Sequence, residues 1–325
     1  MQRRASLIAL AAAAAALPHA LRAQTRAKLW RIGLLSTGAA PKPGQTSAAQ
    51  AIADELRALG HLPGQHFEFV ERYADNDAQR LPALADELLR AKVDLIVTML
   101  TPAALAAQRA TRSIPIVMAA AGDPVGSGLI TSLARPGGNI TGLAALGPEL
   151  AGKCLDLLRE LRPTTKRVAL LLNASDSFTP TLLRGLSEAG ATLGLELRSA
   201  QVQGPGDYAA AFAAWGAQRV DAVFVQPTLA FAPALALALQ QRLPSVSLVR
   251  GFAEAGGLLA YSPNFTERHR KAASYIDKIM RGAQPADLPV QQPSVFDLLV
   301  NAKTAAALGI KVPAALLARA DEVIT

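Results

Sequence analysis

The chain has 325 residues, of which 51% are hydrophobic, and a formal net charge of +8 at pH 7. This length leaves room for two lobes of ordinary domain size, each with a sizeable core. The basic residues are scattered and are not interleaved with aromatic residues, which argues against nucleic-acid binding.

Residues 1–23 have the composition of a secretory signal peptide. Arg3 and Arg4 begin it, an apolar, alanine-rich run follows, and the expected cleavage is after Ala23, with Ala20 as the alternative. The run is too short to cross a bilayer as a stable helix. The sequence therefore predicts an exported, soluble periplasmic protein that does not itself span the membrane. Export by the general secretory route and by the twin-arginine route both stay open.

From Arg31 onward, short strands alternate with helical segments. The predicted strands are 31–36, 67–73, 93–99, 115–120, 140–144, 167–173, 195–202, 220–226, 244–249, 258–262 and 296–301. The predicted helices are 46–60, 78–91, 102–111, 149–161, 180–194, 207–217, 230–242, 266–281 and 304–308. This alternation predicts the α/β class, with doubly wound parallel sheets. The fully apolar runs 95–97 and 168–172 suit strands that are covered on both faces.

The pattern occurs twice along the chain. Residues 31–36 are echoed by 167–172, and residues 93–97 by 220–224. The offset of about 130 residues is far longer than the period of a solenoid or propeller. We therefore expect two doubly wound parallel-sheet lobes that are joined by crossovers and leave a cleft between them, where small molecules bind.

The expected lobes are discontinuous in sequence. The first comprises residues 30–145 plus about 264–288, and the second comprises 146–262 plus about 290–325. Hinges are expected where the chain changes lobe, near residues 145–149, 263–266 and 289–294.

Candidate binding residues follow from the rule that ligands bind outside the carboxyl ends of strands. Thr101 and Pro102 fit the cap and the first turn of a helix, a natural carboxylate site. Asp123 is a candidate partner for an ammonium group, and Phe252 or Tyr261 for an apolar side chain. The full set is Ser36, Thr37, Gly38, Thr101, Pro102, Gly122 and Asp123 in the first lobe, and Asn173, Ser175, Gln226, Thr228, Arg250, Phe252 and Tyr261 in the second.

Each of these residues also has a purely structural interpretation. Thr101 fits an ordinary helix cap, residues 122–124 fit a turn, and Arg250 fits a solvated charge. The argument for a site is that all the candidates occupy equivalent ends of two equivalent sheets.

Enzyme-like motifs are weak. Residues 147–154 (GPELAGKC) match a phosphate-binding loop only up to Lys153, because Cys154 stands where Mg²⁺ requires Ser or Thr. Residues 185–189 (GLSEA) resemble a nucleophile elbow but lie within a helical stretch. Cys154 falls on an apolar helical stripe and is predicted to be a core residue. We therefore expect no catalytic residue, no metal site and no cofactor, and an enzyme in the cleft is the least favoured function.

Several segments resemble the ABC-transporter substrate-binding proteins of the tryptophan/tyrosine-type uptake family. They are residues 113–117 (SIPIV), 122–129 (GDPVGSGL), 132–142 (SLARPGGNITG), 254–258 (EAGGL), 261–264 (YSPN) and 320–324 (ADEVI). The run LARPGGNITG is highly specific, and the resemblance covers nearly all of the predicted mature chain.

The resemblance implies a periplasmic binding protein of type I fold. Such a receptor binds an amino acid or another aromatic or carboxylate solute by hinge closure, docks on an ABC permease in the inner membrane, and is expected to be a monomer. Residues 226–228 (QPT) lack the acidic residue of some amino-acid binders. The alternative is a periplasmic sensor that presents its solute to a membrane signalling receptor through the same cleft.

Overall fold

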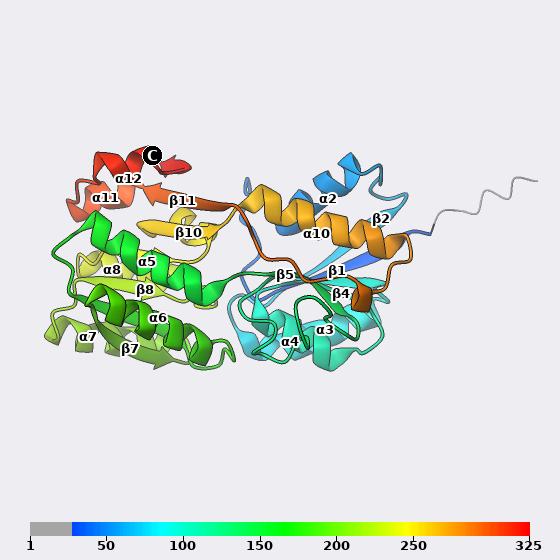
Figure 1. Cartoon of the computed structure of the whole chain (residues 1–325), viewed down its shortest axis with the longest axis horizontal. Coiled ribbons are helices and arrows are strands. Elements are labelled where there is room, and N and C mark those ends of the chain that lie inside the picture. Colours follow the sequence, from blue (N-terminus) through cyan, green and yellow to red (C-terminus); the bar gives the residue numbers. More distant parts are fainter. Residues whose placement is uncertain (1–27) are drawn as a thin grey trace, which may run out of the picture.

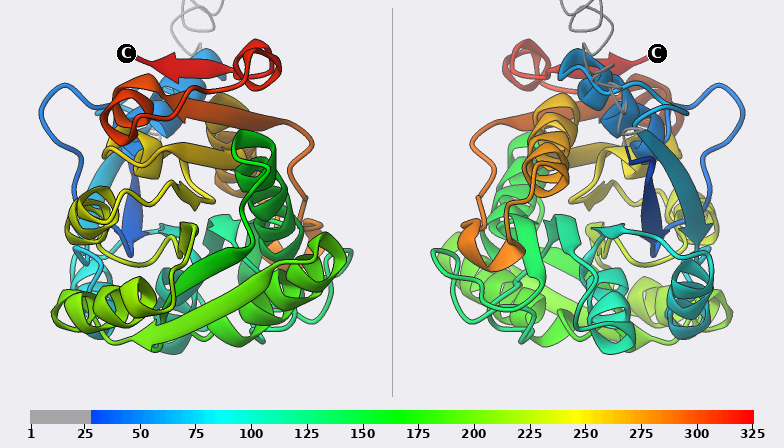
Figure 2. Two further views of the ribbon diagram at one scale, coloured as in Figure 1. Left: turned by 90° about the vertical axis from the view of Figure 1, so that its left-hand side faces the viewer. Right: turned by 90° about the vertical axis from the view of Figure 1, so that its right-hand side faces the viewer.

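The computed structural model describes residues 28–325, so the predicted signal peptide lies outside the described residues. Two α/β lobes lie side by side along the long axis of the molecule (Figure 1). Each is built on its own sheet, with helices on both faces (Figure 2). The predicted fold class is confirmed.

The first sheet has five parallel strands in the order β2-β1-β3-β4-β5. Its strands are β1 (Trp30–Ser36), β2 (Phe67–Tyr73), β3 (Leu95–Met99), β4 (Ile116–Ala121) and β5 (Ile140–Ala144). β4 and β5 are buried at every position. Such continuous apolar runs suit parallel strands that are covered on both faces.

Four helices cover this sheet. α2 (Ala48–Ala58) and α10 (Phe265–Met280) pack on one face, while α3 (Leu81–Arg90) and α4 (Thr101–Ala110) pack on the other. The short helix η1 (Ala78–Arg80) precedes α3. α10 reaches this lobe from late in the sequence and buries Ala272, Tyr275 and Ile276 against α2 and the sheet.

The second sheet has seven strands in the order β12-β11-β10-β9-β8-β6-β7, and only the β10–β11 pair is antiparallel. Its strands are β6 (Arg167–Asn173), β7 (Glu196–Val202), β8 (Ala222–Val225), β9 (Ser245–Ser247), β10 (Leu259–Pro263), β11 (Phe296–Asn301) and β12 (Glu322–Ile324). The predicted strands are all found, and β12 adds a parallel edge strand beside β11.

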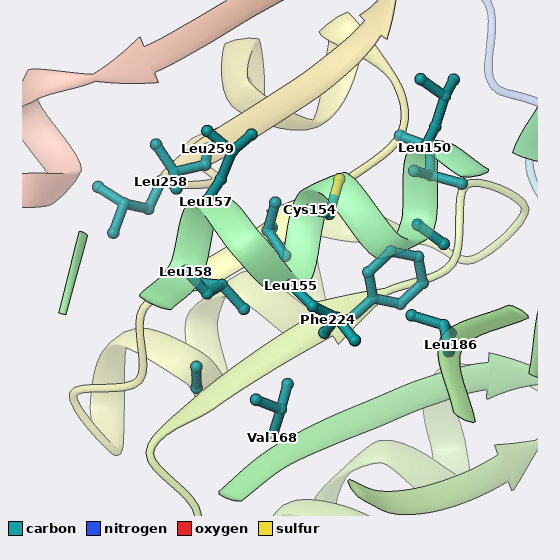
Figure 3. Packing of buried hydrophobic residues seen from close by; sticks show 14 of the residues in the cluster. Leu150, Cys154, Leu155, Leu157, Leu158, Val168, Leu186, Phe224, Leu258 and Leu259 are labelled. Carbon is teal, nitrogen blue, oxygen red and sulfur yellow. The ribbon is translucent and has the colours of Figure 1, made fainter. Parts of the chain in front are cut away.

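Helices cover both faces of the second sheet. α5 (Gly147–Leu161) and α6 (Thr179–Leu193) pack on one face, and α7 (Tyr208–Ala217), α8 (Phe231–Gln240) and α9 (Arg250–Glu254) pack on the other. The remaining helices are η2 (Pro205–Asp207), η3 (Pro285–Asp287), α11 (Ala302–Leu308) and α12 (Ala314–Ala318). Cys154 lies fully buried on α5, among Leu155 and other core side chains (Figure 3), so its prediction as a core residue is confirmed.

The chain passes between the two sheets three times: from β5 to α5, from β10 to α10, and from α10 back to β11. At the first crossing, Leu146 adopts a left-handed conformation with φ of 51°. The third crossing runs beside β5, where the backbone N–H of Gln291 donates to the carbonyl of Gly142 at 3.0 Å.

Candidate functional site

A cavity of about 50 Å³ lies between the two sheets, and both lobes contribute to its lining. Residues at or just after the carboxyl ends of β3, β4 and β5 line one wall, and residues that follow β6, β8 and β9 line the other. Because open α/β sheets bind ligands at these ends, this cavity is the candidate site. Its lining residues are Leu100, Thr101, Ala120, Gly122, Ala145, Gly147, Leu150, Asp176, Phe178, Gln226, Pro227, Thr228, Leu248, Val249, Pro263 and Arg268.

The first-lobe wall includes the start of α4, at Leu100 and Thr101. The hydroxyl of Thr101 accepts a hydrogen bond from the backbone N–H of Gly122 at 3.0 Å, which joins the start of α4 to the end of β4. Leu100 turns the chain into the helix with φ of 70°. The first turn of a helix leaves N–H groups without intrahelical partners and carries the positive end of the helix dipole. This wall therefore favours an anionic group.

The second-lobe wall holds a buried carboxylate. Asp176 Oδ2 accepts hydrogen bonds from Gln226 Nε2 at 2.8 Å and from Thr228 Oγ1 at 3.0 Å, and Oδ1 accepts one from the backbone N–H of Phe178 at 2.9 Å. Burial raises the pKa of Asp176 above its ordinary value, although these hydrogen bonds oppose the shift. The wall thus presents a desolvated carboxyl group in a fixed orientation.

A second layer of hydrogen bonds holds these side chains in place. Gln226 Oε1 accepts hydrogen bonds from the backbone N–H of Asn173 at 2.9 Å and from Thr179 Oγ1 at 3.0 Å. Asn173 Nδ2 donates to Thr228 Oγ1 at 3.2 Å. Because each member is satisfied by another, the network fixes the rotamers of the groups that face the cavity.

Phe178 brings the two lobes into close contact. A Cβ atom placed on Gly122 would lie 2.7 Å from the Phe178 ring, and one placed on Gly147 would lie 2.4 Å from it. Both distances are shorter than non-bonded carbon atoms tolerate. Glycine is therefore required at both positions by the close approach of the aromatic ring.

Arg268 lines the cavity from the first turns of α10, directly after the second crossing. Its Nε atom is buried and has no hydrogen-bond partner within residues 28–325. Burial lowers the pKa of Arg268 to about 10, against the opposing effect of the Asp297 charge, so the side chain stays cationic at neutral pH. The neighbouring His269 is neutral there, because burial and the Arg268 charge lower its pKa to about 3.

Four of the sequence-predicted residues line the cavity: Thr101, Gly122, Gln226 and Thr228. Pro102 follows Thr101 in the first turn of α4, and Asn173 supports Thr228 from behind.

Other predicted residues form hydrogen bonds with protein groups away from the cavity, either within one loop or between neighbouring loops. Ser36 Oγ accepts from the backbone N–H of Gly38 at 3.2 Å, Thr37 Oγ1 donates to the Met99 carbonyl at 3.3 Å, and Ser175 Oγ donates to Gln203 Oε1 at 2.8 Å. None of Ser36, Thr37, Gly38 and Ser175 is in the cavity lining.

The charged and aromatic candidates also lie outside this lining. Asp123 Oδ1 accepts from the backbone N–H of Gly126 at 2.8 Å within a turn. Arg250 is paired with Glu254 at 2.7 Å and with Glu322. Phe252 is fully buried in the core of the second lobe, against Phe231, and Tyr261 stacks on Phe296.

Sequence reasoning missed Asp176, Phe178 and Arg268. Asp176 lies three residues beyond β6, so the strand-end rule that selected Asn173 and Ser175 could have found it. Residues 226–228 contain no acidic side chain, and Asp176 is the acidic residue to which Gln226 and Thr228 donate hydrogen bonds. Arg268 lies inside a helix, beyond the residues that directly follow a strand. The packing of α10 brings it to the cavity.

The two lobes, the three crossings and the shared cavity define a periplasmic binding protein of type I fold. A model of the family described as ABC transporter substrate binding protein matches residues 40–324, and the chain belongs to this family, as the sequence resemblance predicted. Substrate-binding proteins of ABC systems bind a small molecule, work with a transporter permease and act outside the cytoplasm. No helix within residues 28–325 is long and apolar enough to cross a membrane.

The chain is similar to several characterised or solved relatives. It is 24% identical over 273 residues to a tyrosine-binding protein of Clostridioides difficile, a match that covers 83% of this chain and 78% of that protein. It is 26% identical to the crystal structure of an ABC domain in complex with L-Trp from Streptococcus pneumonia, with a TM-score of 0.80. A conserved domain protein of Vibrio cholerae is 27% identical, with a TM-score of 0.82. Each of these structures is covered completely, and each covers 91% of this chain.

Proposed function

We propose that the chain is the solute receptor of an ABC-type uptake system and that it binds an amino acid, or a related aromatic or carboxylate solute, between its lobes. The observation that carries this proposal is the inter-lobe cavity, with a buried, hydrogen-bonded carboxylate on one wall and a helix start on the other. The naming of relatives for tyrosine and L-Trp supports the same class of solute.

The two walls fit the two ends of an α-amino acid. The ammonium group pairs with Asp176, whose buried carboxylate gains an opposite charge. The carboxylate lies at the start of α4, beside Thr101, where the helix dipole and free N–H groups favour an anion. Apolar side chains such as Leu150, Phe178 and Leu248 then surround the body of the solute. No chemistry on the solute is proposed, since its role is recognition.

Binding by hinge closure follows from the three crossings. The lobes are residues 30–145 with about 264–288, and 146–262 with about 290–325, and they rotate about the segments 145–149, 263–266 and 289–294. The contact of Phe178 with Gly122, which joins the two lobes, belongs to the closed form. Solute contacts on both walls favour that form over the open one.

Export and docking complete the proposal. Residues 1–23 direct the chain to the periplasm, where the mature monomer delivers its solute to an inner-membrane permease.

The test is the melting temperature of the purified mature protein with amino acids, peptides, sugars and aromatic acids. A solute at a hundred times its Kd should raise the melting temperature by about 5–10 °C. Absence of any rise across the panel contradicts the proposal. A rise with sugars but with no amino or carboxylic acid contradicts the assigned solute class.

A further inference from the structure

The charged side chains of the inter-lobe cavity match a solute whose own side chain is neutral. Within residues 28–325, the lining holds one acidic side chain, Asp176, and one basic side chain, Arg268. Their charges cancel, and the zwitterion of an α-amino acid adds one charge of each sign. A neutral side chain on the solute therefore keeps the charges of the occupied cavity balanced.

The two uncharged polar side chains of the second-lobe wall already have partners. Gln226 Nε2 donates to Asp176, and Gln226 Oε1 accepts from the backbone N–H of Asn173. Thr228 Oγ1 donates to Asp176 and accepts from Asn173 Nδ2. A phenol hydroxyl or an indole N–H in the cavity would compete with these bonds, because a polar group costs free energy when it is buried without a partner. The polar lining therefore favours a solute with a hydrocarbon side chain.

The cavity is small, and the rest of its lining is largely apolar. Its volume is about 50 Å³, and one water molecule needs about 10–15 Å³ on the same measure, so the cavity holds about three to five groups of that size. Leu100, Leu150, Leu248 and Val249 are among the side chains around it. The two charged ends of an amino acid take up much of this space. A short hydrocarbon side chain fits into the remainder, whereas the ring of tyrosine or tryptophan does not.

Phe178 stands at the boundary between this cavity and a larger groove. The groove has a volume of about 350 Å³ and is lined by both lobes, with Gly122, Leu146 and Pro148 among its residues. The Phe178 ring packs directly on Gly122, which lines both spaces, and on Gly147, which lies between Leu146 and Pro148 in the chain. The ring therefore closes the cavity on the side where a longer side chain of the solute would otherwise extend.

We propose that the solute is an aliphatic amino acid, of the size of alanine to leucine, and that Phe178 is the residue that excludes aromatic side chains. This inference rests on the proposed function, because it assumes that the inter-lobe cavity is the solute site. An aromatic solute would hold the Phe178 ring away from Gly122, and the lobes would close on it incompletely.

The first test is calorimetric titration of the mature protein with L-alanine, L-valine, L-leucine, L-isoleucine, L-phenylalanine, L-tyrosine and L-tryptophan. The best aliphatic amino acid should have a Kd at least about tenfold below that of any aromatic one. An aromatic amino acid that binds as tightly as the best aliphatic one overturns the inference and leaves the proposed function standing. Binding of none of these amino acids overturns the inference, and the wider melting-temperature panel then decides the proposed function separately.

The second test enlarges the cavity. Phe178→Ala joins it to the groove and should lower the Kd of L-phenylalanine, relative to that of the best aliphatic amino acid, by at least about tenfold. Phe231→Ala is the control, because this ring of the same lobe packs on Phe252 outside the cavity lining, and the ratio of the two Kd values should not change. If Phe178→Ala does not fold, Leu248→Ala enlarges the cavity from another side and should lower the same ratio. An unchanged ratio in the folded variant overturns the inference.

Discussion

The two walls of the cavity provide polar groups in different ways. The first-lobe wall uses backbone and one hydroxyl, at Thr101 and Gly122, so its geometry depends on how α4 and β4 meet. The second-lobe wall uses side chains, with Asp176 held by Gln226 and Thr228. The comparison teaches that charge and directional hydrogen bonds are concentrated in the second lobe. We therefore expect substitutions there to change which solute binds, and substitutions in the first lobe to change how far the lobes close.

The largest expected effect on solute affinity comes from removing the carboxylate charge of the second-lobe wall. Asp176→Asn keeps a side-chain oxygen that can accept from the Phe178 N–H but removes the charge that, in the proposed function, pairs with the ammonium group of the solute. Loss of one partner of a buried charge pair costs about 2–5 kcal/mol, so the solute Kd should rise by about 30-fold to over 1000-fold. Asp123→Asn, in its turn outside the cavity lining, is the control and should leave the Kd unchanged. If titration showed a larger rise in Kd for Asp123→Asn than for Asp176→Asn, the ammonium site would have to be assigned to the first lobe.

A substitution in the first wall should act through closure. Gly122→Ala places a methyl group 2.7 Å from the Phe178 ring and forces the lobes apart. Overpacking of this kind costs about 1–3 kcal/mol, which predicts a Kd about 5-fold to 150-fold higher, with a larger radius of gyration for the liganded protein in solution scattering. Gly251→Ala, where an added Cβ meets no atom within 4 Å, is the matched control. Normal affinity and an unchanged radius in Gly122→Ala would show that Phe178 does not limit closure.

The pH dependence of stability should also differ between the walls. Burial raises the folded-state pKa of Asp176 above its ordinary 3.8, so its neutral form is favoured in the fold. The stabilisation this provides is present below the unfolded-state pKa and is lost as pH rises through the raised value. The ligand-free wild type should therefore lose stability relative to Asp176→Asn as pH rises from about 4 towards neutrality. A constant difference in melting temperature over that range would contradict the prediction, and Asp123→Asn provides the baseline.

The smallest expected effect concerns Arg250. Its guanidinium is occupied by Glu254 and Glu322, on the partly exposed edge of the second lobe. Arg250→Ala should therefore leave the solute Kd unchanged and lower the free energy of unfolding by no more than about 1 kcal/mol. Denaturant unfolding and titration measure the two quantities. A tenfold loss of solute affinity would contradict this prediction and indicate that Arg250 contacts the solute.

Strand periodicity and the strand-end rule predicted most of the fold and part of the candidate site. Parallel strands have a distinct apolar signature, and their carboxyl ends converge, so Thr101, Gly122, Gln226 and Thr228 could be predicted without coordinates. Arg250 and Phe252 were predicted to bind the ligand, but neither lines the cavity. This segment forms the short helix α9, which buries Phe252 and brings Arg250 within reach of β12. A five-residue helix has too little periodicity to be recognised, and β12 lies 72 residues away in sequence.

Arg268 shows what sequence reasoning could not reach. It lies within a helical pattern whose apolar face predicts packing and nothing more. The chain crosses from β10 of the second lobe to α10, which packs on the first lobe. Arg268 contacts the cavity because α10 begins next to this crossing. Such a contact depends on tertiary placement and has no local signal.

The late arrival of α10 in the first lobe also sets an order of folding. Residues 265–280 cover one face of the first sheet together with α2, yet they follow nearly the whole of the second lobe in the chain. Until this segment is available, Leu143 and neighbouring apolar side chains on that face remain uncovered. The amino-terminal lobe therefore cannot complete its core during synthesis of its own strands. Completion of the first core is thereby delayed until α10, which ends at Met280, has been synthesised.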